Sequence, residues 1–155
     1  MRLLEPLFER TRVDIVWAGH VHNYQRSVPL RFVPNPPKRV SGDLVNGAFT
    51  LDKKFDGITN TTPRGVIHMV CGGGGAGLYS GGPEKNAEVF TKKYGTNNWV
   101  NFTAKFFDKK HSFAVVDLTA EGLELRALDI DGNEIDRATI TKPLRAPPVV
   151  AKPED

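Results

Sequence analysis

Two of the four histidines, His20 and His22, stand two residues apart in the stretch AGHVHNYQR, residues 18–26. Imidazole is the commonest side-chain ligand of metal ions. Side chains at positions i and i+2 of an extended segment point to the same side. The spacing therefore predicts that both rings converge on one locus, with Val21 facing the core and Gly19 allowing the turn. A His-x-His pair lacks the further ligands that a site needs, so the residues alone leave a metal site and an ordinary surface turn equally open.

A helix and a strand precede the histidines and have to position them. Residues 2–11 carry apolar side chains at helical spacing and predict an amphipathic helix, although Pro6 stands near its first turn. The stretch VDIVWAG, residues 13–19, is β-branched and aromatic and predicts a short buried strand. This order indicates an α/β fold with the histidines at the carboxyl end of a strand, where open α/β sheets bind their ligands.

The middle of the chain alternates between strand signals and segments without a clear pattern. Residues 24–33 predict a further strand, and residues 65–73 predict a strand that leads into the run GGGGAGLYSGG. Residues 34–63 have isolated apolar side chains and several prolines, so a long loop is expected there. No element is assigned to residues 84–110.

The last third of the chain has the simplest pattern. Residues 111–119, 122–130 and 134–142 predict three strands, and the Asp-Gly pair in the last turn is a strong hairpin signal. A closing antiparallel meander would therefore complete one α/β domain over residues 1–142, with one N-terminal helix followed mostly by strands. The proline-rich residues 143–155 are expected to form a disordered tail.

Composition limits the kind of protein. A chain of 155 residues is long enough for one domain with its own core. The net charge of +3 comes from scattered basic and acidic side chains and does not indicate nucleic-acid binding. No apolar run could span a membrane, and the start MRLLEPLFER is not a signal peptide, so a soluble protein is expected. The single cysteine, Cys71, excludes an internal disulfide and leaves the cellular compartment undetermined.

The stretch LLEPLFERTRVDIVWAGHVHNYQRS resembles the calcineurin-like metallophosphoesterases, most closely their purple acid phosphatase-like branch. In that branch a helix and a buried strand lead to a Gly-His-x-His motif, followed by an aromatic residue and an arginine. The run GVIHMVCGGGGAGLY is similar to the next strand and glycine-rich turn of the family, and residues 111–142 are similar to its closing hairpins. The resemblance thus implies the C-terminal part of a metallophosphoesterase-type α/β sandwich.

The resemblance also implies a function. Complete members hydrolyse phosphate esters with two metal ions, for which iron, zinc and manganese are the candidates. The position matched by His20 binds the second ion, and that matched by His22 binds the first. Two cations roughly 3.5–4 Å apart hold the phosphate and turn a bound hydroxide into the nucleophile. Tyr24 and Arg26 match positions that border the motif and are expected to support the turn.

Most of the metal ligands that the resemblance implies are absent from this chain. In the family an Asp-x-His, a Gly-Asp, a Gly-Asn-His and a further histidine precede the motif, but only 18 residues precede Gly19. Asp43 in SGDLVNG lies on the wrong side of the histidines. Two neutral imidazoles carry no negative charge to balance the positive charge of two divalent cations. The chain alone is therefore expected to be inactive, with a missing N-terminal half or another copy of the chain supplying ligands at an exposed strand edge.

Two other interpretations follow from the sequence. Residues 72–77, GGGGAG, match G-x-G-x-x-G, but a dinucleotide site needs a helix to begin there and LYSGGP follows instead. The second is a non-enzymatic β-rich binding module with at most one weak metal site, which predicts a stable monomer, whereas half an enzyme predicts poor solubility or oligomers. His68 and His111 are expected to be structural, and Asp52 and Asp56 to be solvated loop acids.

Overall fold

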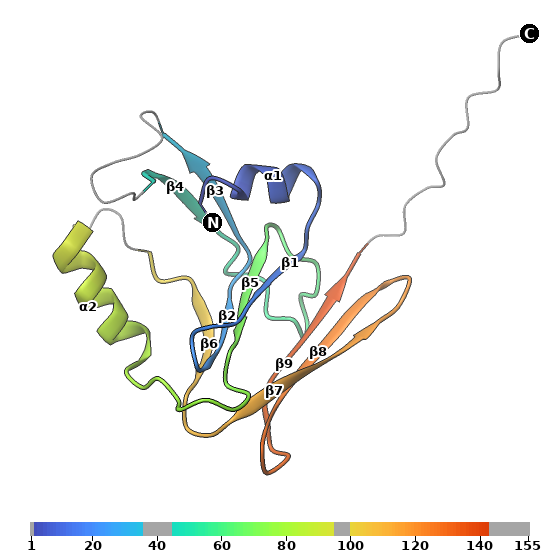
Figure 1. The fold of residues 1–155 in the computed structure, drawn as a ribbon. Helices are drawn as coiled ribbons and strands as arrows, with labels where there is room; N and C mark the ends of the chain where they lie inside the picture. The colour runs from blue at the N-terminus through green and yellow to red at the C-terminus, as the bar shows by residue number, and fades with distance from the viewer. Residues whose placement is uncertain (1, 36–44, 95–99, 143–155) are drawn as a thin grey trace, which may run out of the picture.

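The computed structural model describes residues 2–35, 45–94 and 100–142 of the chain (Figure 1). The α/β class and the closing meander agree with the prediction, but the described residues contain two helices where the sequence predicted one. The elements in chain order are α1 (Glu5–Arg10), β1 (Ile15–Ala18), β2 (Tyr24–Ser27), β3 (Leu30–Pro34), β4 (Gly47–Leu51), β5 (Ile67–Cys71), α2 (Gly82–Tyr94), β6 (Thr103–Phe107), β7 (Ser112–Leu118), β8 (Gly122–Asp129) and β9 (Glu134–Thr141).

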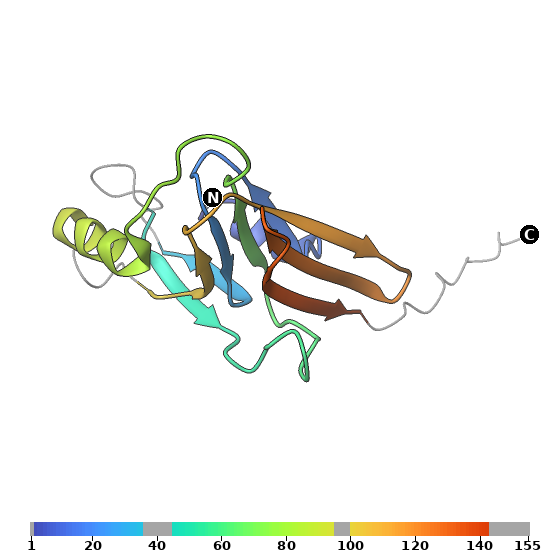
Figure 2. The ribbon, with the colours of Figure 1, turned by 90° about the horizontal axis from the view of Figure 1, so that it is seen from below.

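The strands of the described residues form three sheets. The largest has the order β1-β5-β2-β6, with β1 parallel to β5 and with β2 antiparallel to both of its neighbours. Strands β3 and β4 form a separate hairpin, and β7, β8 and β9 form the predicted antiparallel meander. The meander lies against the four-stranded sheet as a second layer (Figure 2).

The main core lies between these two layers. On one side it consists of alternate residues of β5 together with Tyr24 of β2, and on the other of alternate residues of β8 and β9. The buried members are Tyr24, Phe55, Ile67, Met69, Leu125, Ala127, Ala138 and Ile140. Because the side chains of a strand alternate between two faces, every second residue in this part of β5, β8 and β9 faces the core.

A buried ion pair joins the two layers as well. Arg26 on β2 donates from Nε to Asp136 Oδ2 at 2.7 Å and from Nη2 to Asp136 Oδ1 at 2.9 Å. The hydroxyl of Tyr24 donates to the same Oδ2 at 2.7 Å, and burial together with Asp136 raises the pKa of Tyr24, so the hydroxyl keeps its proton. Arg26 and Asp136 are 7% and 9% exposed. These two neighbours of the histidine motif therefore anchor β2 to the closing meander.

The segments with little sequence signal contain regular elements. The predicted strand over residues 24–33 is two strands, β2 and β3, in different sheets, because Pro29 between them cannot donate to a sheet ladder. The expected long loop over residues 34–63 contains β4, which pairs with β3 along its length. Residues 84–110 include most of α2 and all of β6. The expected tail, residues 143–155, lies outside the described residues.

Strand β1 is an edge strand rather than the buried strand that its sequence predicted. Within the described residues it pairs with β5 alone, and the side chain of Trp17 is 42% exposed. Strands in parallel pairing are usually buried on both faces, so this exposure is unusual for an apolar strand. The open edge matches the expectation of an exposed strand edge.

Helix α1 is shorter than predicted and packs with its polar side toward the sheet. Glu5, whose side chain is 3% exposed, lies with Oε2 2.9 Å from Nε2 of His68 on β5. The apolar residues that predicted a buried helix face, Leu3, Leu4 and Leu7, are instead 41–46% exposed. The spacing of the apolar residues therefore predicted the helix, but it did not identify the helix face that contacts this sheet.

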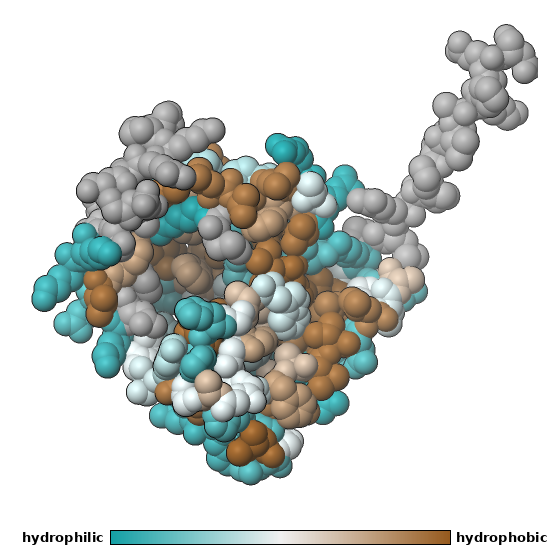
Figure 3. Space-filling view, viewed as in Figure 1, coloured by the Kyte–Doolittle hydropathy of each residue, from teal (hydrophilic) through white to brown (hydrophobic). Residues whose placement is uncertain are grey.

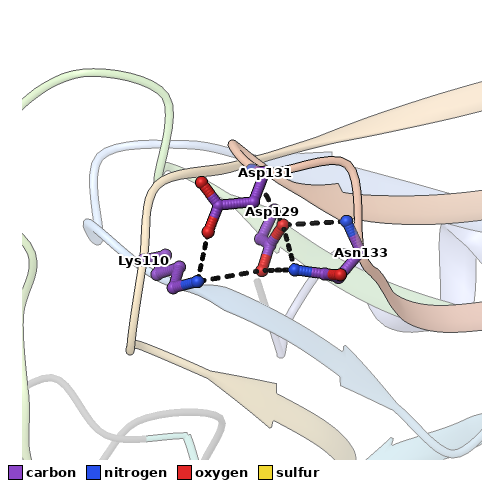
Figure 4. Close-up of polar contacts among 4 residues, drawn as sticks. All are labelled: Lys110, Asp129, Asp131 and Asn133. Carbon is purple, nitrogen blue, oxygen red and sulfur yellow. Dashed lines mark hydrogen bonds and ion pairs between the residues drawn. The ribbon is translucent and has the colours of Figure 1, made fainter.

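The last hairpin turn is organised by Asp129 (Figure 4). Its Oδ1 accepts hydrogen bonds from the backbone N–H groups of Asp131 and Asn133, and the side chain of Asn133 donates to both carboxylate oxygens. Lys110 forms ion pairs with Asp129 at 3.8 Å and with Asp131. A lysine ammonium from the loop before β7 thus lies next to both carboxylates of the hairpin turn.

The turn predicts a pH dependence of stability. The hydrogen bonds from Asn133 are the main cause that lowers the pKa of Asp129 in the folded chain. A lowered folded pKa stabilises the chain above the unfolded pKa of about 3.9, and this contribution is lost as the pH falls through the folded pKa. The loss in unfolding free energy caused by Asp129→Asn, measured in urea, should therefore shrink as the pH is lowered from about 6 to about 2.5. An equal loss at both pH values would contradict the role of ionised Asp129.

Candidate functional site

The two histidines lie in the turn between β1 and β2, at the carboxyl end of β1. His20 has a φ of +71°, in the left-handed region that costs a non-glycine residue free energy. The segment is a tight turn and not an extended continuation of the strand, and Val21 is 36% exposed. The expectation that Val21 faces the core was therefore wrong. Strained backbone of this kind is concentrated at functional sites.

The ring of His22 is held in place from two sides. Its Nδ1 lies 2.8 Å from the carbonyl oxygen of Gly77, and its ring stacks on Tyr79 with 4.2 Å between centroids and an interplanar angle of 22°. A carbonyl oxygen only accepts hydrogen bonds, so Nδ1 carries the proton in the neutral ring and Nε2 keeps its lone pair. Such a hydrogen bond is the usual way in which a metal-binding histidine is oriented.

The glycine-rich run covers the histidine turn. Its first residue, Gly72, donates a backbone hydrogen bond to Asn23 O at 3.1 Å, and Tyr79 N donates to His22 O at 3.0 Å. No helix begins in residues 72–77, and α2 starts only at Gly82, so the structure contradicts the dinucleotide-binding interpretation. Sequence reasoning missed Gly77 and Tyr79 because their contacts with His22 span more than fifty residues and leave no local pattern.

The close approach of this run predicts a large difference between two glycines. A Cβ built on Gly72 would lie 2.1 Å from Val21 O, whereas a Cβ on Gly74 meets nothing within 4 Å. Gly72→Ala should lower the free energy of unfolding by about 1–3 kcal/mol, since backbone has to move, and Gly74→Ala should leave it within about 0.5 kcal/mol. Urea unfolding of both variants checks this; equal stability of the two would mean that the run does not pack on the turn.

The other candidate residues have structural contacts elsewhere. His68 pairs with Glu5, and Nδ1 of His111 lies 3.1 Å from Gly73 O. Asp52 accepts backbone hydrogen bonds from residues 54 and 64, and Asp56 accepts them from residues 58, 59 and 60. These carboxylates shape their own loop, which agrees with the expectation that they are loop acids. Asp43 lies outside the described residues.

The metal-binding side chains of the histidine turn, His20 and His22, would form only part of a metal site. In residues 2–35, 45–94 and 100–142 no group of three or more histidine, cysteine, aspartate or glutamate side chains could hold a metal ion. The turn offers two imidazoles, one of them with an oriented ring and a free Nε2, but no carboxylate. A dinuclear centre therefore does not fit the described residues alone.

Comparisons with known proteins confirm the resemblance of this chain to a C-terminal, metallophosphoesterase-like portion of the purple acid phosphatase-like branch. A purple acid phosphatase from yellow lupin (Lupinus luteus) seeds has a similar structure, with a TM-score of 0.51 and 25% sequence identity. The similarity covers 89% of this chain and 19% of the lupin chain. None of the protein-family models matches the chain.

Sequence relatives point the same way over about half of the chain. An uncharacterised protein of Mycobacterium tuberculosis is 40% identical over 70 residues, which are 45% of this chain and 12% of that protein. A nucleotide pyrophosphatase/phosphodiesterase of Hordeum vulgare is 39% identical over 77 residues, and "probable inactive purple acid phosphatase 27" of Arabidopsis thaliana is 34% identical over 77. The matched part is half of this chain but only 17% and 10% of those two relatives.

The described helices have no membrane-spanning candidate. Neither α1 nor α2 combines the length and the apolar composition that a transmembrane helix requires.

Proposed function

We propose that this chain supplies two histidine ligands, His20 and His22, to the two-metal centre of an enzyme that hydrolyses phosphate esters. The observation that carries the proposal is the orientation of His22, whose Nδ1 faces the Gly77 carbonyl while Nε2 has no hydrogen-bond partner among the described residues. The strained backbone at His20 in the same turn supports it. When bound, two ions of iron, zinc or manganese would supply Lewis-acid activation of the ester and of a water molecule.

The remaining metal ligands would come from polypeptide outside the described residues. The chain spans less than a fifth of its relatives and of the lupin enzyme, so carboxylates of the rest of a longer phosphoesterase, or of another copy of the chain, are the proposed partners. Such a partner would pair with the open edge of β1. Hydrophobic residues gather on the face where α1 and β1 lie (Figure 3), and exposed Trp17 and Leu7 belong to these elements. The chain by itself would then be inactive.

Zinc titration of the chain, followed by nitrogen-15 NMR of the histidine rings, tests the proposal. Zinc should shift the Nε2 signal of His22 and the ring signals of His20. The signals of His68 and His111 serve as internal controls and should move little, because their rings have partners outside the turn. Zinc shifts confined to His68 or His111, or no saturable shift at any histidine, would reject the proposal. A separate assay with para-nitrophenyl phosphate should find no hydrolysis by the chain alone.

A further inference from the structure

A cavity of about 730 Å³ lies at the opposite end of β1 from the histidine turn. It is lined by the last turn of α1, residues 12–14, strand β3 and residues 63–66. Helix α1 and strand β3 lie side by side above this end of the sheet (Figure 1). Because the histidines follow the last residue of β1 and the cavity borders the residues before its first, the two places are separated by the whole strand.

Three arginines, Arg10, Arg12 and Arg31, line this cavity. Arg31 lies with Nε 3.7 Å from a Glu9 carboxylate oxygen, which is a loose ion pair with an exposed arginine. In the part of the chain that the structure describes, the side chains of Arg10 and Arg12 form no ion pair and no hydrogen bond. Two of the three guanidinium groups are therefore available to a ligand.

The acidic side chains at the cavity are already engaged. The other oxygen of Glu9 accepts a hydrogen bond from the backbone N–H of Phe32 at 3.3 Å. Asp14 forms an ion pair with Lys142, which comes from the end of the meander. Neither carboxylate faces Arg10 or Arg12 as an ion-pair partner, so the cavity keeps an excess of positive charge.

The backbone at Arg12 is a second, independent observation. Arg12 has a φ of +59°, and the hydrogen bonds from Arg12 N to Glu9 O and from Val13 N to Phe8 O end α1 in a Schellman motif. The left-handed position of that motif is usually glycine, because a Cβ destabilises this conformation. The chain thus has an arginine where glycine would be more stable, next to a cavity that two other arginines line.

We propose that this cavity binds a small organic phosphate or phosphonate. Its volume lies within the range of about 300–1,000 Å³ that is typical of small-molecule sites. Guanidinium forks match the oxygens of a phosphate group in pairs. Pro6, Val13 and Pro63, which are partly exposed, give the cavity an apolar wall for the organic part of the ligand. The site is separate from the histidine turn and does not depend on the proposed function.

Binding of phenylphosphonate to the full chain, measured by NMR at about 0.15 M ionic strength, tests the proposal. Wild type should bind saturably, with shifts at Arg10, Arg12 and Val13. Arg12→Gly should weaken binding about tenfold while raising the midpoint temperature of unfolding, because it removes the guanidinium and relieves the strained backbone. Arg31→Ala should weaken binding without raising that temperature. Lys109→Ala removes a charge from a side chain that is 82% exposed, in the loop before β7, and should bind as wild type does.

Three results would overturn the proposal. One is the absence of saturable binding at about 10 mM phenylphosphonate. Another is unchanged affinity in both Arg12→Gly and Arg31→Ala. The third is an equal loss in Lys109→Ala, which would mean that the overall charge of the chain attracts the anion. Since Arg12→Gly is expected to be more stable than wild type, a loss of affinity in it cannot come from unfolding.

Discussion

Asp136→Ala is expected to lower the free energy of unfolding by about 3–5 kcal/mol, because it leaves the buried guanidinium of Arg26 without its counter-ion. Both charged groups are almost fully buried, and two hydrogen bonds of 2.7 and 2.9 Å join them. Removal of one partner leaves the other charge buried without a counter-ion. The free-energy cost of that buried charge is far larger than the net contribution of the intact ion pair to stability. The pair connects β2 to β9, so the loss would loosen the meander from the sheet that carries the histidine turn.

Urea unfolding at neutral pH measures this loss in the free energy of unfolding. Two further variants, each with a smaller expected loss, serve as comparisons. Tyr24→Phe removes one hydrogen bond to Asp136 but keeps the ion pair, so it should cost about 0.5–1.5 kcal/mol. Asp117→Ala changes an exposed aspartate on β7 and should stay within about 0.5 kcal/mol of wild type. A loss below about 1 kcal/mol in Asp136→Ala would show that the pair is solvated and that packing alone joins the two layers.

Replacement of both His20 and His22 by alanine is expected to raise the dissociation constant for zinc by at least on the order of 100-fold. Removal of a residue that only hydrogen-bonds to a metal ligand typically lowers metal affinity 10–100-fold. Removal of the ligands themselves should lower the affinity at least as much. The single variant His22→Ala should account for most of the effect, since its ring is the one held by Gly77 and Tyr79. Isothermal titration calorimetry with zinc measures the change.

The control for this prediction is His68→Gln, which removes an imidazole outside the turn and keeps an amide that can reach Glu5. It should bind zinc as wild type does. Far-ultraviolet circular dichroism should be the same for all variants, which separates lost ligands from lost structure. Zinc affinity that survives in the double alanine variant would place metal binding elsewhere and remove the basis of the proposed function.

Local sequence patterns determined several features of this protein. The alternation of apolar residues after His111 determined the three strands of the meander. The Asp131-Gly132 turn determined the hairpin between β8 and β9. The apolar run before Gly19 fixed β1 and placed the histidines at its carboxyl end. These features need only neighbouring residues, because side-chain periodicity and turn chemistry act within about ten positions.

Only the tertiary structure decided what these elements do together. Arg26 and Asp136 are 110 positions apart, and Tyr79 stacks on the ring of His22 from more than fifty positions away, so no local pattern could connect them. Strand β4 lacked a strong signal of its own and is held by β3 through five residue pairs. The apolar residues at the start of the chain predicted a helix correctly, yet only the packing of Glu5 on His68 showed which side of α1 faces the sheet. Periodicity defines an element, whereas its partner depends on contacts that the folded chain brings together from distant positions.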